Sequence, residues 1–84
     1  MDVILRREAE RDLDKLNQPI YGRIIRALKL LESEPPKGDI TPLTGSSTYR
    51  ARVGGYRIIF EIDKGRVDVQ SIKPRGQVYK GGRK

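Results

Sequence analysis

Residues 49–57 read Tyr-Arg-Ala-Arg-Val-Gly-Gly-Tyr-Arg, with two adjacent glycines between two runs of alternating residues. This pattern predicts a β-hairpin, because glycine accepts the positive φ that a tight two-residue turn requires. A turn over the two glycines pairs Val53 with Tyr56 and places Arg52 directly opposite Arg57. The same hairpin therefore predicts both the sheet and a candidate functional site.

The predicted pairing gathers arginines on one face of the hairpin. Arg50 lies two residues along from Arg52 and shares its face with Arg52 and Arg57. Opposed side chains on paired strands start roughly 4.5–5.5 Å apart at Cβ, where like charges repel. An anion would offset this repulsion, and phosphate fits because the planar guanidinium matches its oxygens. The alternative for Arg50 is a surface ion pair with Glu61, which would contribute about 0–1 kcal/mol.

Three strands are predicted in this half of the chain, over residues 48–53, 56–62 and 66–73, with Lys64-Gly65 in the second turn. In simple register one face is apolar and faces the core, while the other is left free for function. The apolar face contains Tyr49, Ala51, Val53, Tyr56, Ile58, Phe60, Ile62, Val67 and Val69. The opposite face contains Arg50, Arg52, Arg57, Ile59 and Glu61.

This simple register has two faults. It places Glu61 opposite Asp68, which is a like-charge pair, and it puts Lys73 on the apolar face. A β-bulge or a strong twist near the third strand would repair both.

The first half of the chain predicts one strand and two helices. Val3-Ile4-Leu5 is a short apolar run, and from Arg6 the apolar period becomes helical. Two buried stripes follow, separated by a break at Asn17 and Pro19: Ala9, Leu13 and Leu16, then Ile20, Ile24, Ala27 or Leu28, and Leu31. Pro35-Pro36 ends the second helix, and residues 35–48 form a loop with a short extended piece near Leu43.

These elements together predict an α+β fold. An N-terminal strand and an antiparallel helical hairpin pack on one face of a small, mainly antiparallel sheet. With 84 residues, the chain should form a single domain over residues 1–80, followed by a flexible tail at 81–84.

Composition narrows the possible functions. The sequence has no cysteine and no histidine, which excludes disulfides and removes the commonest metal ligand and the usual neutral-pH base. We therefore expect neither a metal nor another cofactor. No apolar run approaches the ~20 residues of a membrane span, and no signal peptide is evident, so we expect a soluble, cytoplasmic protein.

The net charge of +7 is unevenly distributed. Residues 1–48 hold eight Lys or Arg and eight Asp or Glu, whereas residues 49–84 hold ten and three. A neutral half joined to a basic half indicates a directed surface for a polyanion, either nucleic acid or an acidic protein. The alternative is a solvated charged face.

The segment after the last strand adds more candidate site residues. Pro74 cannot donate a ladder hydrogen bond, so the strand should end there, and Lys73, Arg75 and Tyr79 would then cross the end of the sheet. With the hairpin arginines they would line one cleft suited to RNA, because arginines bind phosphate and aromatic rings stack on unpaired bases. Alternatively, Tyr79 only packs the chain end.

The ordered set of motifs resembles the RelE/ParE superfamily of toxins from type II toxin–antitoxin systems. The resemblance covers residues 2 to about 80. It includes the opening strand, the charged helical hairpin and residues 49–57. It includes Pro42-Leu43-Thr44-Gly45 and the closing Arg75-Gly76-Gln77-Val78-Tyr79, which favours the RelE branch over the gyrase-poisoning ParE branch. The resemblance implies a RelE-like fold of the microbial-RNase type.

This resemblance implies an mRNA interferase that cuts mRNA in the ribosomal A site. The RNA 2′-hydroxyl would attack the adjacent phosphate, leaving a 2′,3′-cyclic phosphate and a free 5′-hydroxyl. By position, Arg50, Arg52, Lys73 and Arg75 match basic residues of the family, Arg57 matches its phosphate clamp, and Tyr79 matches the tyrosine that positions the nucleotide. We expect Arg50, Arg52, Arg57 and Arg75 to bind phosphate, and Lys73 or Arg75 to donate the proton to the leaving oxygen. A RelB-like antitoxin, the ribosome and mRNA would be the partners.

One departure from the family pattern affects the mechanism. Some relatives have lysine at the position of Arg52, and arginine stays protonated, so it cannot readily act as a base. We therefore expect positioning and charge stabilisation to dominate. Two other functions stay open: a ParE-like protein that inhibits DNA gyrase, and an RNA-binding module without catalysis.

Overall fold

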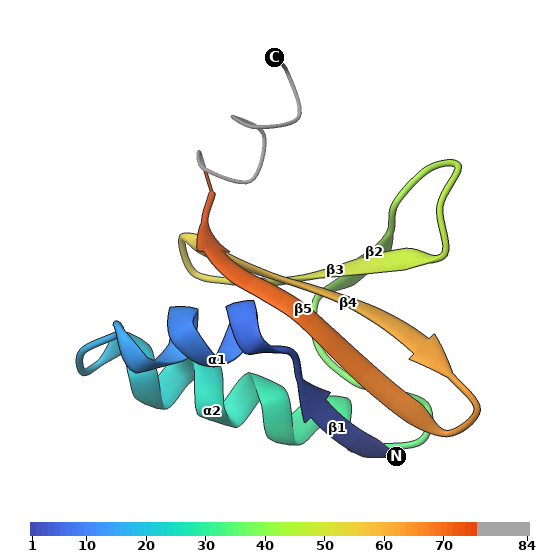
Figure 1. Cartoon of the computed structure of the whole chain (residues 1–84), viewed down its shortest axis with the longest axis horizontal. Coiled ribbons are helices and arrows are strands. Elements are labelled where there is room, and N and C mark those ends of the chain that lie inside the picture. The colour runs from blue at the N-terminus through green and yellow to red at the C-terminus, as the bar shows by residue number, and fades with distance from the viewer. Residues whose placement is uncertain (76–84) are drawn as a thin grey trace.

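The computed structural model describes residues 1–75, which form two helices and five strands (Figure 1). In chain order these are β1 (Asp2–Leu5), α1 (Arg7–Asp14), α2 (Ile20–Leu31), β2 (Ile40–Pro42), β3 (Thr48–Val53), β4 (Tyr56–Asp63) and β5 (Arg66–Pro74). The predicted element order is confirmed. The short extended piece expected near Leu43 is β2, which ends one residue before it.

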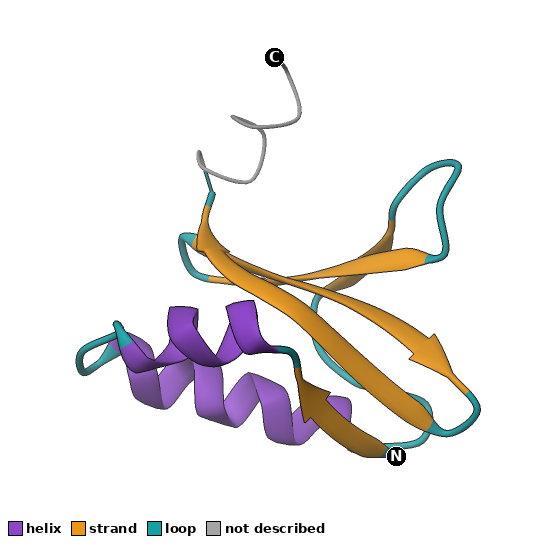
Figure 2. Ribbon diagram, viewed as in Figure 1, coloured by secondary structure: helices purple, strands orange, loops and turns teal. Residues whose placement is uncertain are grey.

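The five strands form one open sheet in the order β1-β5-β4-β3-β2. All neighbours are antiparallel except β1 and β5, which are parallel. Figure 2 shows α1 and α2 running antiparallel to each other on one side of this sheet. The predicted α+β architecture is therefore confirmed, and the helix-free side of the sheet carries the outward-facing hairpin side chains.

The core lies between the helices and the sheet. Helix α1 contributes Ala9 and Leu13, and the larger apolar residues of α2 pack beside them. The buried core residues are Ala9, Leu13, Ile24, Leu28, Leu31, Ala51, Ile58, Phe60, Val67, Val69 and Ile72. The remaining members of the predicted apolar face are partly buried against this core, and Tyr49 stacks on Phe60 with ring centroids 5.6 Å apart. Alternation along the strands thus predicted the buried face correctly.

A β-bulge in β5 lies between its pairing with Ile59 and with Phe60. Ile59 faces Ser71 and Phe60 faces Val69, so Gln70 is the extra residue. Beyond this point the strand parity reverses, and Lys73 pairs with Arg57 instead of lying on the apolar face. The bulge therefore repairs the predicted fault at Lys73.

The bulge does not repair the other fault, because Glu61 still faces Asp68 on the far side of it. Here the charge is offset by Arg6, whose guanidinium donates two hydrogen bonds to the Asp68 carboxylate at 3.1 and 2.9 Å. These bonds hold the pKa of Asp68 below its ordinary value. A residue from the β1–α1 junction thus makes a like-charge strand pair tolerable.

Candidate phosphate-binding site

Three arginines line one pocket at the closed end of the hairpin. Arg52, Arg57 and Arg75 form its walls together with Tyr56 and the two turn glycines, around about 240 Å³. Among residues 1–75, no acidic residue lines this pocket. Such a cluster of guanidinium groups is suited to a phosphate or another compact anion.

The hairpin register brings the first two arginines together. Val53 pairs with Tyr56, and Arg52 lies directly opposite Arg57, as the two-residue turn predicted. Gly54 has a φ of 60°, which is the left-handed conformation that favours glycine. The turn chemistry therefore dictates this part of the site.

The third arginine comes from the end of β5. Its backbone N–H donates a 2.8 Å hydrogen bond to the carbonyl of Gly55, which ties the chain after Pro74 to the hairpin turn. This bond anchors Arg75 at the pocket. The predicted role of Pro74 as the last strand residue is consistent with this geometry.

Arg57 is far less exposed than a free sheet face implies. Only 5% of its surface is accessible, because β4 is a central strand and Arg57 is flanked in register by Arg52 and Lys73. A buried guanidinium is costly to desolvate and gains correspondingly from an anionic neighbour. Within this pocket, Arg57 is therefore the residue we expect to contribute most to anion binding.

Arg52 is held loosely at the pocket rim. Its Nε lies 3.5 Å from a carboxylate oxygen of Asp39, and its backbone N–H donates to the Asp39 carbonyl at 2.9 Å. Both side chains of the ion pair are more than half exposed. An exposed pair of this kind contributes only about 0–1 kcal/mol, so it leaves Arg52 available to a ligand.

Two predicted site residues lie elsewhere, and one lies outside the described residues. Arg50 pairs with Thr41 and Ile59 in the middle of the sheet and does not line the pocket. Lys73 is directed to α1 instead, where its Nζ contacts two carboxylates. Tyr79 lies outside the described residues. The predicted cluster of three hairpin arginines is therefore replaced by two from the hairpin and one from the end of β5.

Helix α1 takes the place of a strand beside the second half of β5. Strand β1 pairs with β5 only as far as Val69, and beyond it the Asp12 carboxylate accepts the N–H of Ile72 at 2.9 Å. The other Asp12 oxygen accepts from Lys73 Nζ at 2.8 Å, and Glu8 lies 3.1 Å from the same Nζ. Asp12 is only 7% exposed, so this is a buried connection between helix and sheet edge.

The hydrogen bond that Lys73 donates to Asp12, with a second one to Glu8, raises the pKa of Lys73 above its ordinary value of 10.5. Such a lysine is fully protonated at neutral pH and is a weaker acid than a free lysine. The same contacts draw the ammonium over the edge of the sheet, although Lys73 is the register partner of Arg57. Among the two proposed proton donors, only Arg75 lines the pocket.

A pH-dependent stability follows from the raised pKa of Lys73. Its contribution to folding is complete below the unfolded pKa of 10.5 and is lost as the pH rises through the higher folded value. Lys73→Met should therefore destabilise the protein by about 1–3 kcal/mol near neutral pH and by less above the folded pKa. Urea unfolding of both proteins at the two pH values tests this, and an equal difference at both would contradict it.

Asp12, Asp39 and Arg23 are site residues that the sequence pattern did not predict. Asp12 could have been noticed as a carboxylate three residues after Ala9 on the buried side of a helix. Nothing in the sequence pairs Asp39 with Arg52, since that contact depends on the path of the loop before β2. Arg23 lies beside the turn because α2 passes the hairpin end.

Comparison with known families identifies the chain. A family model described as the ParE toxin of type II toxin–antitoxin system, parDE, matches residues 3–79. The chain belongs to this toxin family. It is therefore a toxin of the RelE/ParE superfamily, which confirms the resemblance found in the sequence. Among curated protein sequences no match was found.

Solved structures of toxins share the fold. RelE in the RelE–RelB complex of Pyrococcus horikoshii OT3 is 30% identical, with a TM-score of 0.76 over 90% of this chain and 96% of that one. The RelB–RelE antitoxin–toxin complex of Methanococcus jannaschii contains a 24% identical chain, with a TM-score of 0.78 over 93% and 96%. A chromosomal ParDE system from P. aeruginosa matches at 17% identity, with a TM-score of 0.72 over 88% and 95%. RelE and ParE toxins thus share this fold, and fold alone does not separate the two branches.

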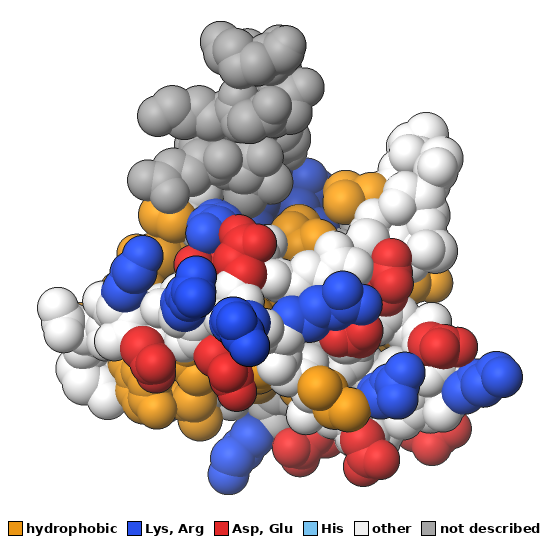
Figure 3. Space-filling model, viewed as in Figure 1, with side chains coloured by type: hydrophobic (Ala, Val, Ile, Leu, Met, Phe, Trp, Pro, Cys, Tyr) orange, Lys and Arg blue, Asp and Glu red, His pale blue; other side chains and the backbone are white. Residues whose placement is uncertain are grey.

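Positive charge does not dominate the face of the toxin that carries α1. Figure 3 shows basic and acidic side chains intermixed over the face that carries α1 and the edge of the sheet. Of the described helices, none is long and apolar enough to cross a membrane. Residues 1–75 also contain no group of three or more acidic, cysteine or histidine residues placed to hold a metal ion.

Proposed function

We propose that this toxin is a ribosome-dependent endoribonuclease that cleaves mRNA in the A site. The observation that supports this most is the convergence of Arg52, Arg57 and Arg75 on one pocket, to which the described part of the chain contributes no acidic residue. A phosphodiester that enters this pocket would meet guanidinium groups from β3, from β4 and from the residue that follows β5. The basic second half of the chain would also favour a polyanionic substrate.

In the proposed reaction the RNA 2′-hydroxyl attacks the adjacent phosphorus. A bond forms between the 2′-oxygen and phosphorus, the bond to the 5′-oxygen breaks, and the products are a 2′,3′-cyclic phosphate and a 5′-hydroxyl. The 2′-hydroxyl proton is lost to water, and the 5′-oxygen gains a proton. Arg57 and Arg52 stabilise the charge that develops on the phosphorane oxygens.

Arg75 is the better of the two proposed donors to the leaving oxygen. It lines the pocket, whereas Lys73 is held by Asp12 and Glu8 with its pKa raised. Arginine is itself a weak acid, so its main contribution would be a charged hydrogen bond to the leaving oxygen. The ribosome would supply the in-line orientation of the RNA, which is consistent with a pocket that contains no histidine.

A RelB-like antitoxin is the proposed protein partner. Several of the solved relatives are antitoxin–toxin complexes with RelB. We propose that an acidic or amphipathic antitoxin segment wraps the helices and sheet and covers or displaces the basic surface. Toxicity of the chain expressed alone, relieved by co-expression of its antitoxin, would support this, and an absence of toxicity would count against it.

Inhibition of DNA gyrase is the second candidate function. It is favoured by the family model, which describes a ParE toxin. A gyrase inhibitor would cleave no RNA. The two candidates therefore differ in their effects: the first produces cleaved mRNA, and the second inhibits gyrase and leaves mRNA intact. An RNA-binding module without catalysis would occupy the A site and leave the mRNA intact.

Cell-free translation separates these functions. We expect the toxin to produce new mRNA 5′ ends at A-site codons when ribosomes are present, with little cleavage of naked RNA. Sequencing of 5′ ends gives the position of each cut, and a parallel supercoiling assay with purified gyrase gives the alternative activity. Gyrase inhibition without mRNA cleavage would contradict the proposed function, and ribosome stalling on intact mRNA would indicate the binding module.

A further inference from the structure

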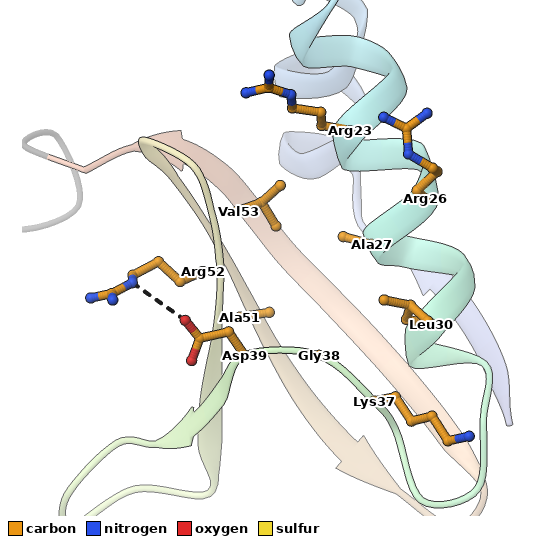
Figure 4. A pocket seen from close by; sticks show the side chains of 10 residues that line it. All are labelled: Arg23, Arg26, Ala27, Leu30, Lys37, Gly38, Asp39, Ala51, Arg52 and Val53. Atoms are coloured by element: carbon orange, nitrogen blue, oxygen red, sulfur yellow. Dashed lines mark ion pairs between the residues drawn. The ribbon is translucent and has the colours of Figure 1, made fainter.

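A second group of cations lies beside the pocket, in a groove of about 260 Å³ between α2 and β3 (Figure 4). Its lining includes Arg23 and Arg26 from α2, Lys37 from the following loop, and Arg52 from β3. Arg52 therefore lines both the groove and the phosphate pocket, so the two hollows meet at this side chain.

The two α2 arginines lie differently. An Nη1 of Arg23 is 3.9 Å from the position that a Cβ atom would take at Gly54, so its guanidinium reaches the hairpin turn. Arg26 instead lies back along its own helix, with an Nη1 3.8 Å from the corresponding position at Gly22. Figure 4 shows Arg23 extending away from α2 toward the strands, with Arg26 directed to another side.

Arg23 carries an unneutralised charge within the described residues. The ion pairs of residues 1–75 involve Arg6, Arg52, Arg66 and Lys73, and none involves Arg23. The groove lining contains one carboxylate, that of Asp39, which is paired with Arg52. The end of the groove next to the turn thus offers a cation to an anionic ligand.

The hairpin turn itself places no side chain between Arg23 and the pocket. Gly54 and Gly55 carry no side chains, and apart from the chain neighbours of Gly55 no heavy atom of residues 1–75 lies within 4 Å of a Cβ position there. A single nucleic-acid strand that crosses the turn would place one phosphate in the pocket and the neighbouring phosphate near Arg23. Farther from the turn, the groove is lined by Ala27 and Leu30, with Lys37 beyond them (Figure 4).

We propose that Arg23 forms a second phosphate subsite, for the phosphate next to the one bound by Arg52, Arg57 and Arg75 on the same RNA strand. The inference rests on the proposed function and extends it from a single linkage to two. The subsite would fix which way the strand runs over the hairpin turn. It would also add a charge contact outside the reacting phosphate, which can orient the substrate without taking part in bond cleavage.

A binding cycle with a non-cleavable RNA tests this subsite. The probes are short 2′-O-methyl RNA strands, in which one linkage at a time is replaced by an uncharged methylphosphonate. Arg23→Gln should lower affinity about fivefold at ~0.1 M salt and reduce the salt slope by about 0.7, the value for one single-strand phosphate contact. For one particular methylphosphonate position, Arg23→Gln should no longer lower the affinity, because the phosphate that Arg23 contacts has already lost its charge. That position should be next to the one at which Arg57→Gln no longer lowers the affinity.

Lys29→Gln is the matched control, because it removes a positive charge from an exposed position of the same helix that lines neither the groove nor the pocket. It should leave both affinity and salt slope nearly unchanged. If Arg23→Gln has no effect on any probe while Arg57→Gln does, the subsite is wrong and the phosphate pocket stands. If neither variant weakens RNA binding, the proposed function itself fails.

An acidic peptide is the alternative ligand for the groove. We would measure binding of a peptide of alternating glutamate and leucine to the same variants. Weaker binding of this peptide by Arg23→Gln, with unchanged RNA binding, would assign the groove to a protein segment and overturn the RNA subsite.

Discussion

Arg57→Gln should lower A-site cleavage by about 10²–10³-fold, by analogy with the loss of one preorganised donor at an oxyanion. Arg57 is 5% exposed and lines the pocket, so its charge acts where little water competes. Primer extension on mRNA from a cell-free translation reaction measures the cleavage rate. The cleavage rate of Arg57→Lys should fall between those of the wild type and Arg57→Gln, because lysine keeps the positive charge but lacks the planar guanidinium fork.

Arg66→Gln is the control for this experiment. Arg66 also belongs to the sheet, but it begins β5 at the end opposite to the pocket, and half of its side chain is exposed. Its removal should leave cleavage unchanged. Thermal unfolding of each variant separates a catalytic loss from a folding defect, and full cleavage by a folded Arg57→Gln protein would exclude the clamp role.

Asp12→Ala should destabilise the fold by about 3–5 kcal/mol, which is the cost of breaking a buried ion pair from one side. The substitution leaves the Lys73 ammonium without its closest carboxylate and the buried Ile72 N–H without an acceptor. A loss of this size is comparable with much of the total stability of a small domain. Urea denaturation, followed by circular dichroism, measures it.

Two further variants separate the parts of this connection. Asp12→Asn keeps an oxygen for the Ile72 N–H and loses the ion pair, so its loss of stability should be smaller than that of Asp12→Ala. Asp14→Ala removes an exposed carboxylate from the same helix and should change stability by less than about 0.5 kcal/mol. Equal effects of Asp12→Ala and Asp14→Ala would show that the buried contact contributes nothing.

Local sequence patterns were sufficient to predict the hairpin and the buried face. Gly54-Gly55 set the turn, and the period-two alternation that follows it placed Ile58 and Phe60 in the core. A one-residue slip would have reversed every side chain, so a correct turn fixes the whole β3–β4 pair. The opposition of Arg52 and Arg57 followed from the same rule.

The rest of the site depends on contacts between segments distant in the sequence. The position of Lys73 required the bulge at Gln70, which composition does not reveal. Its carboxylate partners lie more than sixty residues away on α1, and the end of β1 leaves the β5 edge open to them. Arg75 was predicted as a site residue, but its hydrogen bond to Gly55 is a tertiary contact that only the structure provides.

The proposed function requires the guanidinium groups of Arg52, Arg57 and Arg75 to bind one ribose–phosphate linkage together. Guanidinium NMR resonances of the intact toxin, followed during titration with a 2′-O-methyl dinucleotide, test it most directly. We expect the Nε–H signals of these three residues to shift together along one saturable curve, while that of Arg66 stays in place. Saturable binding that leaves the Arg57 and Arg75 signals unmoved would contradict it.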